Sequence, residues 1–414
     1  MINNTKRLTG APKFRLRYLS AAIAVGMGQL VIMSPVHAAD DLTSAITGGK
    51  ASMDMRYRFE TVDQDGFDEK AESATVRTRL GYLTDDYMGL SAFIEMEDIS
   101  VVGAGDYAPK ESGFPTVADP ELTELNQGYL SYSAPGETLI NVGRQRVILD
   151  NARFVGNVGW RQNEQTYDLV LLQNKGISDT TLTYAYVHRV NDVKGDNLDV
   201  DTHLLNASYA GLSFVKITAY GYLIDYETDA VAEDDIQTIG LRLSGGAPLS
   251  DDFKLLYSAE YANQSDYQDN ERDIDVNYTL LEIGGELFGV TAKIGQETLE
   301  GQSLDGGGKY GFQTPLATKH GFNGWADKFL TTPGDGIVDQ YVSIGGNVAD
   351  VKLQAVYHQY SADVGGDDWG NELNVLAAMN FGKHYQLGAK LANYNADEHA
   401  TDTEKVWLWG QLKF

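Results

Sequence analysis

Four arginines lie close together in residues 142–162, which read VGRQRVILDNARFVGNVGWRQ. They are Arg144, Arg146, Arg153 and Arg161. The chain as a whole is acidic, with 32 Lys and Arg against 59 Asp and Glu. A guanidinium group binds carboxylates and phosphates through paired hydrogen bonds. The concentration of arginine therefore predicts either selection of anions or ion pairs that hold a nearby segment in place, and the surrounding elements must decide between them.

The first 38 residues have the pattern of a secretory signal peptide. Five basic residues, the last being Arg17, precede a small-and-apolar run from Leu19 to Met33, and SPVHAAD offers a cleavage site after Ala38. Removal of residues 1–38 leaves 27 basic and 59 acidic residues, a formal charge of −32. We expect an exported protein with a single domain over residues 39–414.

Composition excludes several classes of protein. The chain has no cysteine, which rules out disulfides, thiolate metal sites and a lipid-modified cysteine after the signal peptide. No second apolar run of about eighteen residues follows, so membrane-spanning helices are excluded. The mature chain has no composition break or Pro/Ser-rich linker, and we expect no nucleic-acid partner.

From about residue 50 the chain alternates between apolar and polar residues in segments of 9 to 14 residues. In SMDMRYRFE, for example, apolar Met55 and Tyr57 alternate with Arg56 and Arg58. This period of two predicts β-strands with one apolar face. Eighteen such segments begin near residues 50, 74, 88, 123, 138, 167, 180, 201, 212, 236, 253, 276, 290, 336, 350, 370, 384 and 403.

The connections between these segments alternate in length. Short turns at 84–87, 134–137, 176–179 and 288–290 alternate with long loops near 61–73, 99–122, 149–166, 265–275 and 301–335. Transmembrane barrels have short periplasmic turns and longer external loops, and a closed barrel satisfies every backbone polar group in lipid. The sequence therefore predicts an all-β fold, a transmembrane antiparallel β-barrel of about 18 strands in the bacterial outer membrane.

The expected barrel gives each arginine a direction. Arginine on the lipid face costs about 2–4 kcal/mol at the midplane. The arginines of the first two strands alternate with apolar residues and are expected to line the pore, namely Arg56, Arg58, Arg77 and Arg79. Arg144 and Arg146 are ambiguous, because they share parity with Ile140 and Val142: either these aliphatic residues line the lumen or a bulge shifts the register. The cost of burial favours both arginines as pore-lining residues.

Arg153 and Arg161 fall in the loop after the fifth strand, where they form a constriction if this loop folds into the pore. Across the barrel, strands eleven to thirteen carry four acids at expected lumen positions, Glu260, Glu282, Glu286 and Glu297. A basic ridge facing an acidic wall would orient and concentrate charged solutes. The alternative is that the arginines pair with acids and pin an inward loop. The sequence leaves both interpretations open.

At VGRQR…NVGWRQNEQTYD and at GFQTPLATKHGFNGWADKF (residues 311–329), the sequence resembles the outer-membrane alginate export family. The resemblance covers nearly the whole mature chain and implies an 18-stranded barrel with an arginine-lined pore for an anionic uronate polysaccharide. It also implies pore roles for Arg144 and Arg146 and a constriction role for Arg161. Two features depart from the family: the turn around Lys383 is too short to plug the periplasmic mouth, and the lumen carries many acids.

Other motifs carry no catalytic chemistry. LDGGGKY (304–310) lacks the Ser or Thr of a phosphate-binding loop and the strand-to-helix context around it. The histidines show no spaced ligand pair, and we interpret Asp201 and His203 as a solvated strand end. The acidic loops carry oxygen ligands suited to Ca²⁺ or Mg²⁺, so they are either simply solvated or bridged to lipopolysaccharide by divalent cations. We expect no catalytic site, cofactor or metal site.

Three hypotheses follow. The favoured one is an outer-membrane channel that passes anionic or carbohydrate-like solutes through an arginine-lined pore. The alternative is an exit duct for a secreted anionic exopolysaccharide such as alginate, working with periplasmic export partners. A barrel enzyme is the third and least supported. The expected partners are outer-membrane lipid, lipopolysaccharide, and an anionic solute or oligosaccharide.

Overall fold

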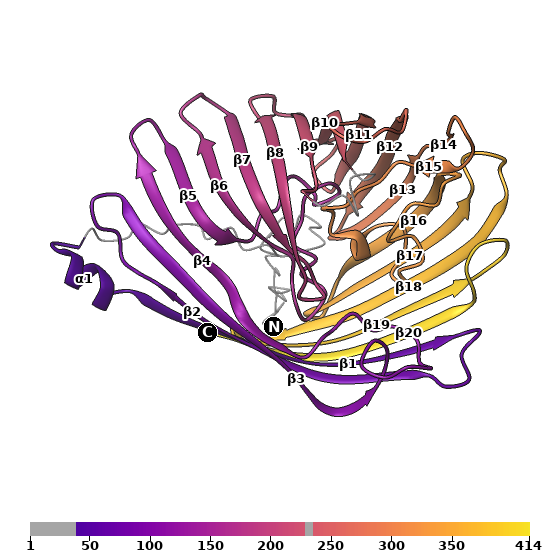
Figure 1. The fold of residues 1–414 in the computed structure, drawn as a ribbon, viewed down its shortest axis with the longest axis horizontal. Coiled ribbons are helices and arrows are strands. Elements are labelled where there is room, and N and C mark those ends of the chain that lie inside the picture. The colour runs from indigo at the N-terminus through magenta and orange to yellow at the C-terminus, as the bar shows by residue number, and fades with distance from the viewer. Residues whose placement is uncertain (1–38, 228–234) are drawn as a thin grey trace, which may run out of the picture.

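The computed structural model describes residues 39–227 and 235–414, and these form one closed barrel (Figure 1). Eighteen antiparallel strands make a single sheet, which closes because β20 pairs with both β19 and β1. The predicted transmembrane antiparallel barrel of about 18 strands is confirmed. The signal peptide predicted for residues 1–38 lies outside the described residues.

The barrel strands are β1 (Lys50–Gln64), β2 (Ala71–Leu83), β3 (Leu90–Asp106), β4 (Leu122–Ala134), β5 (Thr138–Gln145), β6 (Thr166–Asn174), β7 (Thr180–Asn191), β8 (Asn197–Tyr209), β9 (Val215–Ile224), β10 (Ile236–Pro248), β11 (Phe253–Asp266), β12 (Asp275–Leu287), β13 (Val290–Leu299), β16 (Ile337–Val348), β17 (Val351–Ser361), β18 (Asp368–Phe381), β19 (Tyr385–Asn395) and β20 (Thr403–Lys413). Outside the barrel sheet are the hairpin β14 (Gly301–Ser303) and β15 (Lys309–Gly311), the short helix α1 (Leu42–Thr47) and the 3₁₀ turn η2 (Lys319–Gly321). In the described part of the chain, no helix combines the length and the hydropathy that a membrane crossing needs.

The predicted strand starts agree with the observed ones to within four residues, the largest difference being 201 against Asn197. At the long-loop end, β1, β2 and β3 extend further than predicted, most clearly β3, which continues to Asp106, whereas β5 ends earlier, at Gln145. A small apolar cluster explains this extension. Val62 and Ala71 are buried there against Tyr107 and Val117 of the β3–β4 loop. This loop covers the inner face of β1 and β2, so the strands continue into the region predicted to be loop.

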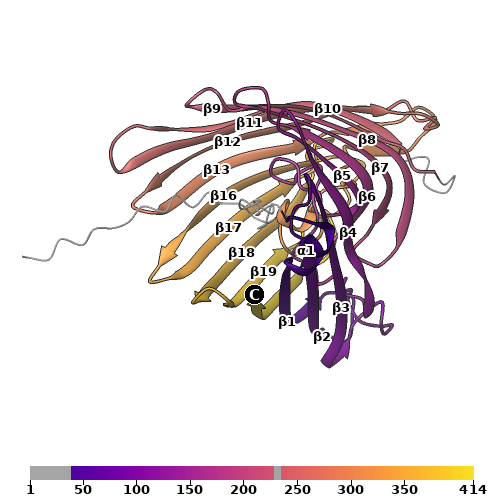
Figure 2. The ribbon, with the colours of Figure 1, turned by 90° about the vertical axis from the view of Figure 1, so that its left-hand side faces the viewer.

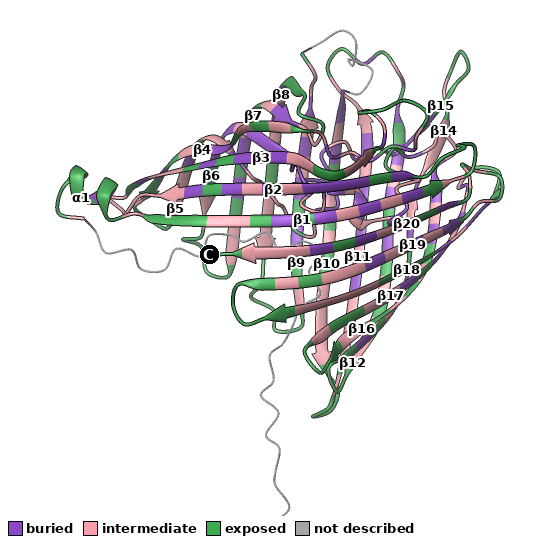
Figure 3. Cartoon of the chain, turned by 90° about the horizontal axis from the view of Figure 1, so that it is seen from below, coloured by how far each residue is buried: buried purple, intermediate pink, exposed green. Residues whose placement is uncertain are grey.

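The two faces of the strands differ as alternation requires. On β1, Met55 and Tyr57 are exposed, whereas Arg56, Arg58 and Glu60 are buried. The strands coloured by burial show the same alternation along β1 and β2 (Figure 3). Exposed apolar side chains on the outer face are what a lipid-facing barrel wall requires.

The short turns at one end of the barrel are tight. At Phe288 and Gly289 both central residues have positive φ, 51° and 81°, between the paired residues Leu287 and Val290. Such two-residue turns match the twist of the flanking strands. In outer-membrane barrels the short turns lie at the periplasmic end. The first strand, β1, begins at this end and the last strand, β20, ends there.

Two long connections fold into the barrel, and both appear as coil inside the ring of strands (Figures 1 and 2). The first inward loop, residues 146–165, joins β5 to β6; the second inward loop, residues 312–336, joins β15 to β16. They pack on each other through backbone hydrogen bonds, in which Gly156 N donates to Leu316 O at 2.8 Å and Thr318 N donates to Ala152 O at 3.0 Å.

Aromatic residues fill one side of the interior beneath these loops. Phe154 of the first inward loop lies 5.2 Å, centroid to centroid, from both Tyr220 on β9 and Tyr278 on β12, and 6.0 Å from Phe312. The interior over β9–β12 is therefore filled with packed aromatic side chains and is not uniformly polar.

Candidate functional site

Four arginines of β1 and β2 form a buried group, which we call the arginine cluster: Arg56, Arg58, Arg77 and Arg79. All four lie on the inward face, and none is more than 7% exposed. Arg56 stands directly opposite Arg77 in the strand register. Like charges placed opposite each other across strands are destabilising, so this arrangement requires partners from elsewhere in the chain.

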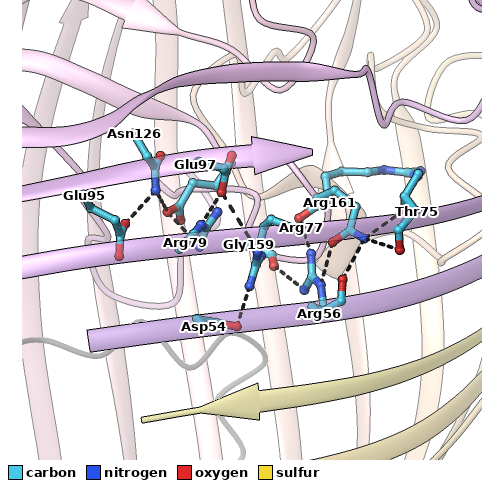
Figure 4. Close-up of polar contacts among 12 residues, drawn as sticks. Asp54, Arg56, Thr75, Arg77, Arg79, Glu95, Glu97, Asn126, Gly159 and Arg161 are labelled. Carbon is cyan, nitrogen blue, oxygen red and sulfur yellow. Dashed lines mark hydrogen bonds and ion pairs between the residues drawn. The ribbon is translucent and has the colours of Figure 1, made fainter. Parts of the chain in front are cut away.

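The first inward loop supplies many of those partners (Figure 4). Arg56 Nε donates to the Gln162 side chain at 2.9 Å, and its guanidinium also donates to the Gly159 and Trp160 carbonyls at 3.3 and 3.0 Å. Arg58 donates to the Trp160 carbonyl, pairs with Asp119 of the β3–β4 loop and lies 3.4 Å from Glu60. These contacts hold residues 159–162 against the wall.

Glu164 is the hub of the same network. Its fully buried carboxylate accepts from Arg79 at 3.0 Å, from Asn126 at 2.9 Å, and from Arg146 at 2.6 Å. Arg79 also pairs with Glu97. Burial alone would raise the pKa of Glu164, but Arg146 and Arg79 hold it well below its usual range. One carboxylate of the first inward loop thus binds β2 and β4 of the wall and, through Arg146, the start of its own loop.

Arg144 and Arg146 separate, although they are two residues apart. Arg146 follows the end of β5 and points inward to Glu164. Arg144 shares the outer face with exposed Val142, and the register places it beside Asp168, which accepts from it at 2.7 and 3.1 Å. The expectation that Arg144 lines the pore is therefore corrected.

Arg144 was expected to face the pore because an unpaired arginine on the outer face is costly, but Arg144 is paired. Arg144 and Asp168 neutralise each other, and Arg144 Nη1 also donates to the Leu125 carbonyl at 3.2 Å, beside the bulge at Asn126. A neutral pair satisfied in this way avoids most of the penalty of an isolated arginine on the outer face. Strand β5 needs no bulge, because its pairing with β4 is continuous.

Arg153 and Arg161 lie inside the barrel and connect the two inward loops to each other and to the wall. Arg153 donates to Glu297 on β13 at 2.7 Å and to Asn323 of the second inward loop at 3.0 Å. Arg161 lies 3.1 Å from Glu60 on β1 and 2.7 Å from Asp327. Burial opposes the charge of both arginines, but these carboxylates raise the pKa of each.

A second buried group of charged and aromatic side chains lies where the two inward loops meet the wall, and it was not predicted from the sequence. Lys390 on β19 lies 3.8 Å above the ring centroid of Trp325 and 4.3 Å above that of Trp160. Its Nζ donates to His320 Nε2 at 2.7 Å, while His320 Nδ1 lies 2.6 Å from Asp327. Burial lowers the pKa of His320 to about 3, so the imidazole is neutral and can accept from lysine. The available signal was a lysine at an inward position of β19.

Three of the four acids expected on strands eleven to thirteen are also occupied, whereas Glu286 forms no ion pair with a described residue. Glu260 pairs with Arg242 and accepts from Tyr220 at 2.9 Å. Glu282 accepts from Lys293 at 2.9 Å, and Glu297 is bound by Arg153. The expected ridge facing an acidic wall is therefore largely a set of local ion pairs.

A cavity of about 360 Å³ remains next to the inward loops. Aromatic and amide side chains line it together with charged pairs, and its walls include Phe322, Trp325, Tyr341, Asn323, Gln354 and Lys293. Within residues 39–227 and 235–414, no His, Cys, Asp and Glu side chains group in a way that could hold a metal ion.

A closed 18-stranded barrel with an apolar outer face and loops folded inside is an outer-membrane β-barrel. No protein-family model matches the sequence, and no curated protein shows significant sequence similarity to it. Solved structures of Occ/Opd outer-membrane porins share the fold.

OccK9 (OpdG) of Pseudomonas aeruginosa superposes with a TM-score of 0.69 at 14% identity, over 90% of this chain and 100% of that one. OpdL of P. aeruginosa gives 0.68 at 16% identity over 89% and 99%. OccAB4 of Acinetobacter baumannii gives 0.67 at 15% over 88% and 98%. At these identities the likeness establishes the fold.

The expected membership in the alginate export family is wrong, because the matching structures belong to the Occ/Opd group. The alternative of an exit duct for alginate is not supported either. The two stretches that carried the resemblance lie on the two inward loops and their borders. Their Trp, Gly and Arg residues form the contacts of these loops with the barrel wall. They therefore report how an interior loop is held, and not which polymer passes through the barrel.

Proposed function

We propose that this protein is a selective diffusion channel of the outer membrane for small anionic or carbohydrate-like solutes. The observation that carries the proposal is the pair of inward loops, which narrow an otherwise wide barrel and are fixed to its wall. An 18-stranded barrel without such loops encloses a broad aqueous channel. Loops held by buried ion pairs convert it into a passage of defined size.

The arginines contribute to this proposal mainly by holding the constriction. Arg56, Arg58, Arg77, Arg79, Arg153 and Arg161 are each at most 7% exposed, with partners on the loops or on the wall. Side chains this deeply buried make little direct contact with a passing solute. Arg146, with 21% of its side chain exposed, is the sequence-predicted pore residue best placed to meet one.

Carbohydrate-like solutes fit the cavity beside the loops. The aromatic rings of Phe322 and Tyr341 offer apolar surfaces, and amides such as Asn323 and Gln354 offer donors and acceptors. Pockets of this kind, mostly apolar with a few placed polar groups, are typical of small-molecule sites. The charged groups in the cavity are paired, which favours solutes that carry little charge or a single anionic group.

Liposome swelling tests this proposal. We expect purified protein to admit glucose and gluconate at measurable rates and to exclude a large dextran. A matched variant that lacks residues 150–163, bridged by a short Gly–Ser linker, should lose selection by size. The absence of any permeability in the full chain would contradict the proposal, and so would free passage of dextran.

A further inference from the structure

Six lysines occupy inward positions at the short-turn end of the barrel, and we call them the lysine arc: Lys50, Lys216, Lys254, Lys293, Lys352 and Lys413. Five of them lie among the first four residues of their strands, which are β1, β9, β11, β13 and β17. Lys413 is the last residue of β20. They are therefore gathered at one mouth of the barrel although they are spread along the whole sequence.

The strand alternation places these side chains on the inward face. Lys352 shares its face with Val356 and His358, both buried in the interior, and Lys254 shares its face with buried Ser258 and Glu260. Lys50 has the parity of Arg56. Lys293 lines the interior cavity.

Contacts support the same placement for the other two lysines. Lys216 Nζ lies 3.5 Å from Asp150 of the first inward loop, which is inside the barrel. Lys413 Nζ lies 3.4 Å from Asp54, which in turn pairs with Arg77 of the arginine cluster at 3.0 Å.

The lysine arc differs from the arginine cluster in accessibility. Five of the six lysines are exposed and the sixth, Lys293, is half-buried. Lys50, Lys254 and Lys352 form no ion pair with any other described residue. Inward acids near this mouth are fewer, namely Asp54, Asp150, Glu282 and Glu286. The first three are paired with Lys413, Lys216 and Lys293, and Glu286 stands opposite Lys254 in the strand register without forming an ion pair with it.

We propose that the lysine arc, rather than the arginine cluster, sets the ion selectivity of the channel by presenting accessible ammonium groups to solutes at the periplasmic mouth, chiefly those of Lys50, Lys254 and Lys352. This inference rests on the proposed function, since it names the residues that select in that channel. Low-dielectric barrel walls focus the field of such charges into the water between them. The acids of the nearby turns, such as Asp251 and Asp252, lie between the strands and are exposed.

Salt should modulate this effect strongly. The Debye length is about 10 Å at 0.1 M and about 30 Å at 0.01 M salt. At low salt the fields of neighbouring lysines therefore overlap across the mouth, whereas at high salt each acts only near itself. Anion preference should appear in dilute salt despite the acidic composition of the chain.

The test is the reversal potential of the full-length protein in planar bilayers under a KCl gradient. It is measured twice, once with concentrations near 0.01 M and once with concentrations near 1 M. The triple variant Lys50→Gln, Lys254→Gln and Lys352→Gln removes the three lysines without ion pairs, so the barrel should fold normally. We expect its anion-to-cation permeability ratio to fall about eightfold at low salt, about twofold for each lysine, and far less at 1 M, where charges are screened.

The matched control is Lys110→Gln, Lys194→Gln and Lys309→Gln, which removes the same charge from the long-loop end. Lys110 and Lys309 pair with Glu121 and Asp335, so this control also leaves two carboxylates unpaired. Unpaired carboxylates favour cations, so the control would lower the anion-to-cation permeability ratio at least as much if position did not matter. An equal or larger shift in the control, or no shift in the first triple variant, would overturn the assignment. A wild-type protein that does not conduct would instead defeat the proposed function.

Discussion

The arginine cluster and the lysine arc carry the same charge inside the same barrel, yet they are built in opposite ways. The arginines sit on β1 and β2, are almost fully buried, and bind carboxylates and backbone carbonyls of the loops. The lysines sit at strand ends; five of the six are exposed, and three form no ion pair with a described residue. The difference teaches that burial and pairing decide whether an interior cation supports the structure or acts on solutes.

The residue types suit these roles. Arginine has a planar fork of donors that satisfies several acceptors at once, which is what a loop with exposed carbonyls needs. Lysine is a compact, strongly hydrated charge on a flexible stem, which favours contact with water and mobile ions. A measurement that reversed the two roles would remove the basis of the comparison.

The largest effect is expected at Glu164. The substitution Glu164→Gln leaves Arg79 and Arg146 without their shared carboxylate in a buried site, and breaking a buried pair on one side costs about 3–5 kcal/mol. We expect a lower urea midpoint for unfolding and larger, noisier single-channel currents, because the first inward loop is released. As a control, Glu121→Gln changes an exposed acid of Lys110 and should leave both measurements near wild type; unchanged currents in Glu164→Gln would show that the loop is held by other contacts.

The pH dependence of stability gives the second test. His320 has a folded pKa of about 3, below its unfolded value near 6.5. As pH falls below about 6.5, the unfolded chain binds a proton that the folded chain does not, so stability falls progressively until about pH 3, by up to about 1.4 kcal/mol per pH unit. Unfolding followed between pH 7 and 5 should show this loss in the wild type and a smaller one in His320→Gln; parallel curves would mean that His320 is not held neutral by burial and Lys390.

A matched pair of single substitutions addresses selectivity directly. One charge about 8 Å from an ion in water is worth about 0.5 kcal/mol, roughly a twofold change in permeability ratio. In dilute salt we expect Lys254→Gln to lower the anion-to-cation permeability ratio, obtained from the reversal potential, about twofold. Arg56→Gln should lower this ratio less, because Arg56 is covered by the first inward loop. A larger shift in Arg56→Gln would place the selecting charges back on the arginine cluster.

The smallest effect is expected at Arg144. Because it faces outward and pairs with Asp168, Arg144→Gln should leave ion selectivity unchanged and cost only about 1 kcal/mol of stability. Reversal potentials and urea midpoints provide the measurements. A clear shift toward cation preference would show that Arg144 faces the pore after all, while Arg146→Gln provides the inward-facing comparison two residues away.

The sequence by itself determined the architecture. Period-two alternation, the regular change between short turns and long loops, and the inward parity of Arg56 and Arg77 all follow from local geometry, because successive side chains of a strand point to opposite faces. Even the strand starts were predictable, since the turn and the alternation mark them in the same few residues. The inward parity of the lysines at strand ends is equally present in the sequence.

Only the tertiary structure decided which charges are covered. Arg144 and Arg146 look alike in sequence, and their separation depends on Asp168 of the next strand and on Glu164 of a loop that folds back inside. The His320–Lys390 contact joins residues 70 positions apart, and the Arg161–Asp327 pair joins two loops from opposite halves of the chain. Alternation fixes the face on which a side chain lies, whereas its partners and its exposure depend on which loop covers that face, and this is settled by packing between distant segments.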